Sequence, residues 1–153
     1  MQKIDHIDRK LLAAVQKNAR LTADQLSNAC GLSPTAAMKR LKKLRAEGVI
    51  EREVAVISPK AVGLRTMIIA LVTLERESKA AIDSFKKTIR NTPQIVEGYY
   101  ITGDADFILT IATADIEEYE EFTRNFFYDK LRVKSFKSLV VMDVLKAQNA
   151  MPL

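Results

Sequence analysis

The chain has 153 residues, a formal net charge of +5 at pH 7 and a hydrophobic fraction of 48%. This length accommodates one ordinary domain or two small ones, and the apolar fraction supports a packed core rather than wholesale disorder. One cysteine excludes an internal disulfide, and one histidine with one cysteine excludes a His/Cys metal site. The longest apolar run, residues 67–72, is too short to cross a bilayer, and the charged N-terminus does not resemble a signal peptide. We therefore expect a cytoplasmic protein with no metal, no cofactor and no membrane partner.

The positive charge is concentrated in the first part of the chain. Residues 1–60 contain 12 Lys/Arg against 6 Asp/Glu, whereas residues 61–153 contain 12 against 13. Such an imbalance indicates a polyanionic partner for the first segment. A solvated basic helix without a partner would give the same excess. The positions of the cations along the chain are needed to distinguish these two explanations.

The first thirty residues predict two helices with start and stop signals. Residues 5–18 carry Ile, Leu and Val at helical spacing, and Asp5 can cap that helix. Thr22 and a glutamine three residues on have the pattern of a capping box for a second helix over 23–30. Gly31 follows, where a left-handed turn needs a residue without Cβ. These signals place a tight turn directly before the next helix.

A third helix over 34–47 is predicted by Ser33 as its cap and Pro34 at its first position. Apolar residues recur along one side of it: Ala37, Leu41 and Leu44. Its other sides carry five cations in seven residues: Lys39, Arg40, Lys42, Lys43 and Arg45. Two short helices around a tight turn, the second basic and packed on one side only, are the physical requirements for a helix-turn-helix that enters a DNA major groove.

The rest of the chain predicts strands and helices in the order βαββαβ. Residues 49–57 are rich in β-branched residues and alternate weakly, which predicts a short linker strand. The later elements are strands over 66–74, 95–102, 106–112 and 133–145 and helices over 79–90 and 116–128. This order is typical of a ferredoxin-like sandwich, in which helices cover one face of an antiparallel sheet. We expect a second subunit to cover the other face, in a face-to-face dimer.

Five short motifs follow one another along the chain. They are IDRKLL at residues 7–12, LSPT at 32–35, RLKKL at 40–44, GVI at 48–50 and TGDADF at 102–107. With these motifs in this order, the chain resembles the Lrp/AsnC family, the leucine-responsive or feast/famine transcription regulators, over nearly its whole length.

The resemblance implies an α+β protein that is a one-component transcription regulator and not an enzyme. Residues 1–50 would form a three-helix (winged) helix-turn-helix domain, 51–63 a linker strand or hinge, and 64–153 a ferredoxin-like effector-binding and oligomerisation domain. Double-stranded DNA and a small-molecule effector, typically an amino acid, would be the partners. Homodimers would form through the C-terminal domains, commonly assembling further into octamers. The effector would bind between C-terminal domains and shift assembly or DNA affinity.

The final strand departs from the family pattern. Family members often show V-x-x-T-x-T there, with hydroxyls lining the effector site, whereas this chain has Val133, Phe136 and Ser138 at the matching places. The preceding loop, residues 128–131, lacks the common Pro-Gly. An aromatic ring in place of a hydroxyl would reshape the pocket, so leucine is not assumed to be the effector.

The DNA contacts are expected at the start of the third helix and along its basic face. Base edges are assigned to Ser33, Thr35, Ala36, Met38 and Lys39, phosphates to Thr22, Arg40, Lys42 and Lys43, and Pro34 belongs to the same surface. Two alternatives stay open at this point. Met38 would pack in the core, and Arg40 would form an ion pair with a nearby acid such as Asp8.

The effector site is expected at the turn Thr102, Gly103, Asp104, Ala105 and Asp106. The ammonium of an amino acid requires a carboxylate such as Asp104 or Asp106, and its carboxylate requires backbone N–H groups in a tight turn opened by glycine. Phe136 and Ser138 would line the side-chain end. A plain hairpin is the alternative, because Gly-Asp is ordinary turn chemistry.

An enzyme and an architectural DNA-bending protein are the two rival classes. The second half of the sequence lacks a His-based acid/base group, a phosphate loop and a nucleophile–base pair, so we expect no catalytic residues. A nucleoid-organising protein of the same fold, with little effector dependence, needs the same cations and stays open. The ratio of affinities for target and random DNA would distinguish it from a local regulator.

Overall fold

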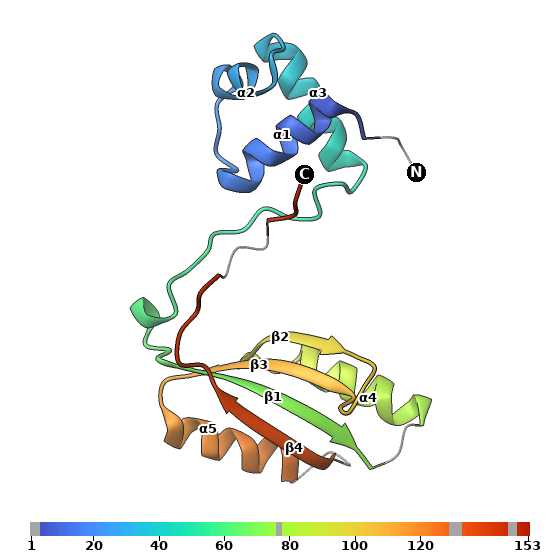
Figure 1. Ribbon diagram of the computed structural model, residues 1–153, viewed down its shortest axis with the longest axis vertical. Coiled ribbons are helices and arrows are strands. Elements are labelled where there is room, and N and C mark those ends of the chain that lie inside the picture. The colour runs from blue at the N-terminus through green and yellow to red at the C-terminus, as the bar shows by residue number, and fades with distance from the viewer. Residues whose placement is uncertain (1–3, 76–77, 129–132, 147–149) are drawn as a thin grey trace. The chain divides into compact units, whose positions relative to one another are not determined.

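A computed structural model describes residues 4–75, 78–128, 133–146 and 150–153 (Figure 1). The chain forms two compact units, residues 1–56 with 146–153, and residues 57–145. Among the described residues, no helix is long and apolar enough to span a membrane.

The first unit contains the three predicted helices, α1 (His6–Lys17), α2 (Ala23–Cys30) and α3 (Pro34–Ala46). Each begins at the capping side chain expected for it, because Asp5, Thr22 and Ser33 all accept a hydrogen bond from a backbone N–H three residues on. Gly31 ends α2 in the left-handed conformation, with φ 72°. The buried apolar residues of this unit come from all three helices: Leu11, Val15, Leu26, Cys30, Ala37 and Leu41.

The second unit is a four-stranded antiparallel sheet with two helices. Its elements are η1 (Lys60–Val62), β1 (Thr66–Leu74), α4 (Lys79–Arg90), β2 (Ile95–Tyr100), β3 (Phe107–Thr113), α5 (Ile116–Thr123), η2 (Arg124–Tyr128) and β4 (Val133–Val140). The strand order is β2-β3-β1-β4, and every neighbouring pair is antiparallel. The predicted βαββαβ order and ferredoxin-like architecture are confirmed.

The core of the second unit lies on one face of the sheet. Alternate residues of β1 and β3 are buried there, and the rings of α4, α5 and η2 pack against them. Phe85 of α4 shows the arrangement, since its ring centroid lies 4.7 Å from Phe107 of β3 and 5.9 Å from Phe126 of η2. The helices α4 and α5 thus cover the same face, and the other face has no covering element within the described residues of this unit.

Several predicted elements differ in extent from those of the structure, including the strand predicted over 95–102, which ends at Tyr100. Residues 49–57 form no strand, and the last strand ends at Val140 rather than at residue 145. A strand exists only where a neighbouring strand supplies a ladder of hydrogen bonds. Within the described residues, these segments make only isolated backbone bonds: the Val49 and Ile50 N–H groups donate to the Leu44 carbonyl oxygen at the end of α3, and the Val141 N–H donates to the Met67 carbonyl oxygen. The helix over 116–128 is α-helical to Thr123 and continues as a π-helical turn, η2.

Candidate nucleic-acid interface and effector site

Helix α3 presents one face to the core and the opposite face to solvent. Ala37, Leu41 and Leu44 are almost completely buried. Thr35, Met38, Lys39 and Lys42 are exposed on the other side, as helical spacing requires. Met38 is 39% exposed, so the alternative that it packs in the core is wrong.

Arg40 lies between these two faces and is held by acids at the start of α1. Its Nη1 donates to Asp5 Oδ2 at 2.6 Å and to Asp8 Oδ1 at 3.0 Å. The hydrogen bond from Arg40, helped by the backbone N–H of Asp8, lowers the pKa of Asp5 to about 2. The same two carboxylates raise the pKa of Arg40. In the structure, Arg40 therefore forms the ion pair that was the alternative to a phosphate contact. Its guanidinium holds α1 against the middle of α3.

The remaining predicted phosphate contacts lie at the surface. Lys42 and Lys43 are exposed, and Lys43 Nζ lies 3.8 Å from Glu47 Oε1 one turn further on. Thr22 is exposed as well, and its hydroxyl accepts a hydrogen bond from the Gln25 N–H at the start of α2. One unit with a net positive charge thus contains all of these features: the first turns of α2 and α3, and the side of α3 that carries Lys39, Lys42 and Lys43.

The turn between β2 and β3 contains the predicted effector residues. Gly103 has φ 133°, a conformation that side-chain-bearing residues rarely adopt. Thr102 and Asp104 are exposed, and Ala105 and Asp106 are half-buried. The turn is closed by a bond from the Ile101 N–H to the Asp106 carbonyl oxygen at 2.9 Å.

Asp106 has a structural partner that the sequence did not reveal. Its Oδ2 accepts a hydrogen bond from the Leu74 N–H at 2.8 Å, and its own N–H donates to the Val72 carbonyl oxygen at 2.9 Å. The side chain therefore ties the turn to the end of β1. Asp104 is the more exposed of the two carboxylates proposed for a ligand ammonium.

Phe136 and Ser138 are separated from this turn by one strand. They are on β4, opposite Val72 and Ala70 of β1, and β1 separates them from the turn, whose Asp106 bonds to Val72 from the other side. The Phe136 ring stacks on Phe127 with centroids 4.3 Å apart. The hydroxyl of Ser138 lies 2.6 Å from that of Tyr119 on α5, a contact missed because it depends on strand register. Burial raises the pKa of Tyr119.

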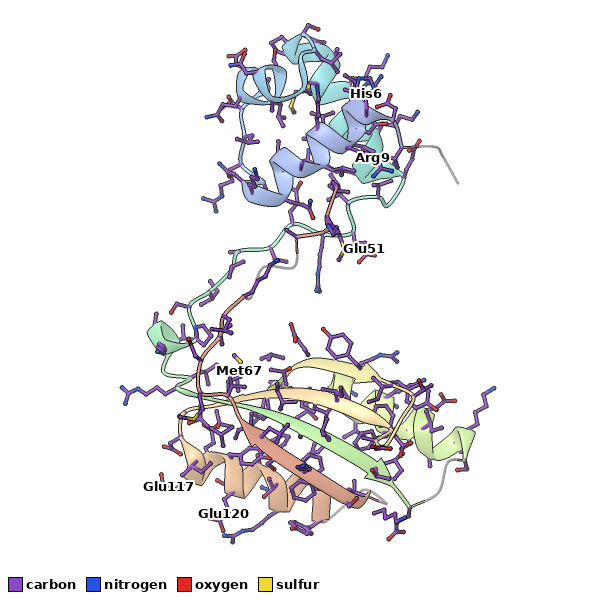
Figure 2. The ribbon with its side chains drawn as sticks, viewed as in Figure 1. His6, Arg9, Glu51, Met67, Glu117 and Glu120 are labelled. Carbon is purple, nitrogen blue, oxygen red and sulfur yellow. The ribbon has the colours of Figure 1, made fainter. Side chains whose placement is uncertain are left out.

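The acidic residues of α5 also have ordinary structural roles. Glu117 and Glu120 project away from the sheet (Figure 2), and both are exposed. Glu118 Oε2 accepts a hydrogen bond from the Ala114 N–H at 2.6 Å, at the N-terminus of the helix. Glu118 also lines an open cleft of about 300 Å³ beside Gln94 and Asn125, which includes none of the predicted effector residues.

Comparison with known proteins identifies both parts of the chain. The family model for the Lrp/AsnC ligand binding domain matches residues 67–151, and that for the winged helix-turn-helix DNA-binding domain matches residues 4–51. The chain belongs to the Lrp/AsnC family. It is accordingly a transcription regulator with a DNA-binding and a ligand-binding domain, and not an enzyme.

Similar proteins cover nearly the whole chain. The uncharacterised HTH-type transcriptional regulator y4tD of Sinorhizobium fredii is 54% identical over 151 residues, which are 99% of this chain and 89% of that protein. The leucine-responsive regulatory protein of Haemophilus influenzae is 30% identical over 95% of this chain and 88% of its own length. A transcriptional regulator from Neisseria meningitidis, solved as a complex with L-Met, superimposes with a TM-score of 0.93 at 28% identity and covers 98% of this chain and 97% of its own.

Proposed function

We propose that this Lrp/AsnC protein is a sequence-specific DNA-binding regulator whose DNA affinity or assembly changes when an amino acid binds between C-terminal domains. The observation that carries the DNA-binding part is the orientation of α3. Its three core residues are buried, so its Thr35, Lys39 and Lys42 side is exposed and free to enter a major groove.

The residues of this surface divide by chemistry into two groups. Base contacts are proposed for Ser33, Thr35, Ala36, Met38 and Lys39, with Pro34 setting the start of the helix. Phosphate contacts are proposed for Thr22, Lys42 and Lys43. Arg40 is instead a positioning residue, because both Asp5 and Asp8 hold its guanidinium.

Selection of duplexes from a random DNA library tests this proposal. We expect a preferred sequence, bound at least a hundredfold more tightly than a scrambled duplex at the same salt concentration. Thr35→Ala should alter the preferred bases, whereas Lys42→Ala should weaken all duplexes alike and reduce the log–log salt slope by about 0.9. Lys87→Ala, an exposed lysine on α4, is the control. Equal affinity for selected and scrambled duplexes would favour the architectural alternative.

An amino-acid effector is supported by the relative solved with L-Met and by the exposed turn with its carboxylate. In the proposed site Asp104 attracts the ligand ammonium, and the N–H groups of Thr102, Gly103 and Ala105 receive its carboxylate. Phe136 and Ser138 act on the site through β4 and its packing on α5. A ligand at about 100 times its dissociation constant adds about 2.7 kcal/mol, or several degrees in melting temperature. A panel of the twenty amino acids with no such shift would contradict the proposal.

Self-association is supported by the uncovered face of the sheet. Its partly or largely exposed apolar side chains are Ile69, Leu71, Tyr99, Ile108 and Leu139. A contiguous apolar surface of this kind is typical of an interface, and we propose homodimers that assemble further, to octamers. Leu71→Lys should shift the sedimentation coefficient toward that of the monomer, and Lys87→Ala should not.

A further inference from the structure

One residue of α2 is bonded to both residues of the turn that leads into α3 (Figure 1). The carbonyl oxygen of Ser27 accepts a hydrogen bond from the Gly31 N–H at 2.8 Å, and the Ser27 hydroxyl donates to the Leu32 carbonyl oxygen at 2.5 Å. Gly31 itself turns the chain through the left-handed region, with φ 72°. Ser27 thus holds the chain both at the turn glycine and at the residue after it.

The hydroxyl bond is the unusual one of the two. The bond to Gly31 joins residues four apart and would form in a helix that ends at this glycine whatever the side chain at position 27. A serine hydroxyl inside a helix ordinarily bonds back to a carbonyl three or four residues earlier. Here the hydroxyl bonds forward, across the turn, to a residue outside α2. This bond therefore depends on the side chain of Ser27 and joins α2 to the segment that starts α3.

The Leu32 carbonyl lies at a position that affects the direction of α3. The peptide unit is planar, so fixing this oxygen also fixes the Ser33 N–H in the same plane. Ser33 Oγ accepts a hydrogen bond from the Ala36 N–H at 3.3 Å, and the Ser33 carbonyl oxygen accepts one from the Ala37 N–H at 2.9 Å. A path of hydrogen bonds through one rigid peptide plane thus runs from Ser27 to the first turn of α3.

This peptide lies where the chain leaves the core and enters the surface proposed to meet DNA bases. Ser27 and Leu32 are half-buried, and Leu32 packs against the core of the unit, whereas Ser33 and Thr35 are exposed. A half-buried carbonyl that loses its partner has poorer access to water, so loss of the hydroxyl favours a rotation of the peptide toward solvent. Such a rotation would change the direction of Ser33 and Thr35 and leave the core helices in place.

We propose that Ser27 is a positioning residue for DNA recognition, whose hydroxyl fixes the peptide that leads into α3 and so sets the direction in which the first turn of α3 meets the bases. Ser27 is not among the residues proposed to contact DNA, so it acts through Leu32 and Ser33. The effect on base preference rests on the proposed function, whereas the ordering of the first turn does not. Two measurements separate the ordering of the turn from its effect on DNA.

Hydrogen exchange of backbone amides in the free protein, followed by NMR, tests the ordering of the first turn of α3. In Ser27→Ala the Ala36 and Ala37 amides should exchange roughly fivefold faster relative to the amides of α1, the factor that corresponds to the loss of one neutral hydrogen bond. Alanine is the best helix former, so the variant should fold. Asn28→Ala is the matched control, because it removes an exposed polar side chain from the next position of α2. Unchanged exchange at Ala36 and Ala37 in Ser27→Ala would overturn the proposal.

DNA binding tests the effect on base preference. The ratio of the affinities for the selected and the scrambled duplex should fall roughly fivefold in Ser27→Ala. The log–log salt slope should stay the same, because no phosphate contact is lost. Ser27→Thr retains a hydroxyl and should restore most of the ratio. A residue that merely stabilises the unit would leave the ratio unchanged, since the ratio compares two duplexes bound by the same folded protein.

The outcomes distinguish failure of the positioning role from failure of the proposed function. Faster exchange with an unchanged affinity ratio would overturn the proposal, because Ser27 would then order the turn without setting base preference. A ratio that falls equally in Asn28→Ala would also overturn it, since the effect would belong to α2 as a whole. Equal affinity of the unmodified protein for selected and scrambled duplexes would contradict the proposed function and the base preference together, and the exchange rates would still decide whether Ser27 orders the turn.

Discussion

The helix-turn-helix unit and the ligand-binding domain are built by different kinds of interaction. In the first, every helix begins at a local cap, and the core consists of a few small or aliphatic side chains between three short helices. In the second, aromatic rings from α4, α5 and η2 cover one face of a sheet, and none of this unit's described elements covers the other face. The first unit is thus specified by signals a few residues apart, and the second by pairing across the chain.

This difference predicts which unit tolerates a cavity. Phe85 is 1% exposed and contacts Phe107 and Phe126, so it joins a helix to the sheet and to the π-helical turn. Phe85→Ala should reduce the free energy of unfolding of the ligand-binding domain by about 3–5 kcal/mol. Urea unfolding followed by near-ultraviolet circular dichroism measures it, since the first unit has no aromatic residue in its described helices. A loss below about 1 kcal/mol would show that the aromatic core contributes little to the stability of the ligand-binding domain.

A second test concerns a close approach of helix α4 to strand β2. A Cβ on Gly98 of β2 would lie 2.9 Å from Ile89 Cγ2 on α4 and 3.4 Å from Leu109 Cδ2. Gly98→Ala should therefore destabilise the ligand-binding domain by about 1–3 kcal/mol, because a well-packed core resists added volume. The double variant Gly98→Ala/Ile89→Ala removes the clashing methyl group and should be coupled favourably in a double-mutant cycle. Strict additivity of the two changes would contradict this account.

The features that the sequence predicts and those that it does not reveal also divide into local signals and contacts between distant residues. Asp5, Thr22 and Ser33 were expected as caps because a cap and its N–H are three residues apart. The Tyr119–Ser138 contact and the bond from Leu74 to Asp106 join positions 19 and 32 residues apart, which no local pattern encodes. The prediction of a linker strand over 49–57 is wrong for a related reason, because a strand forms only where a neighbouring strand supplies hydrogen bonds.

The turn between β2 and β3 can be separated into a structural and a ligand-binding part. Asp106→Asn keeps an oxygen for the Leu74 N–H but loses the charge, whereas Asp106→Ala loses both. We expect Asp106→Ala to destabilise the domain by about 1–2 kcal/mol and Asp106→Asn to have a much smaller effect. If Asp104 is the counter-charge of the ligand, Asp104→Asn should abolish the amino-acid-induced melting shift without changing the melting temperature of the free protein. An unchanged shift in Asp104→Asn would refute that role.

The smallest expected effect is the pH dependence of the link between α1 and α3. The pKa of Asp5 is about 2 in the folded protein, lowered by the hydrogen bond from Arg40, against an ordinary value of 3.8. A carboxyl whose folded pKa is depressed contributes stability that is complete above its unfolded pKa and is lost as pH falls through the folded one. The contribution of Asp5 should therefore be constant above about pH 5 and disappear between about pH 4 and pH 2.

Arg40→Ala should reduce this loss, since it removes the main cause of the lowered pKa while leaving the backbone bond from Asp8. The measurement is the melting temperature of both proteins at pH 7, 4 and 2.5, with Arg45→Ala as the control because its partner is the unrelated Glu53. The two melting temperatures should converge as the pH falls from 4 to 2.5. A constant difference over that interval would mean that Arg40 stabilises the unit by packing and not through the charge of Asp5, although the two residues are 35 positions apart and in contact.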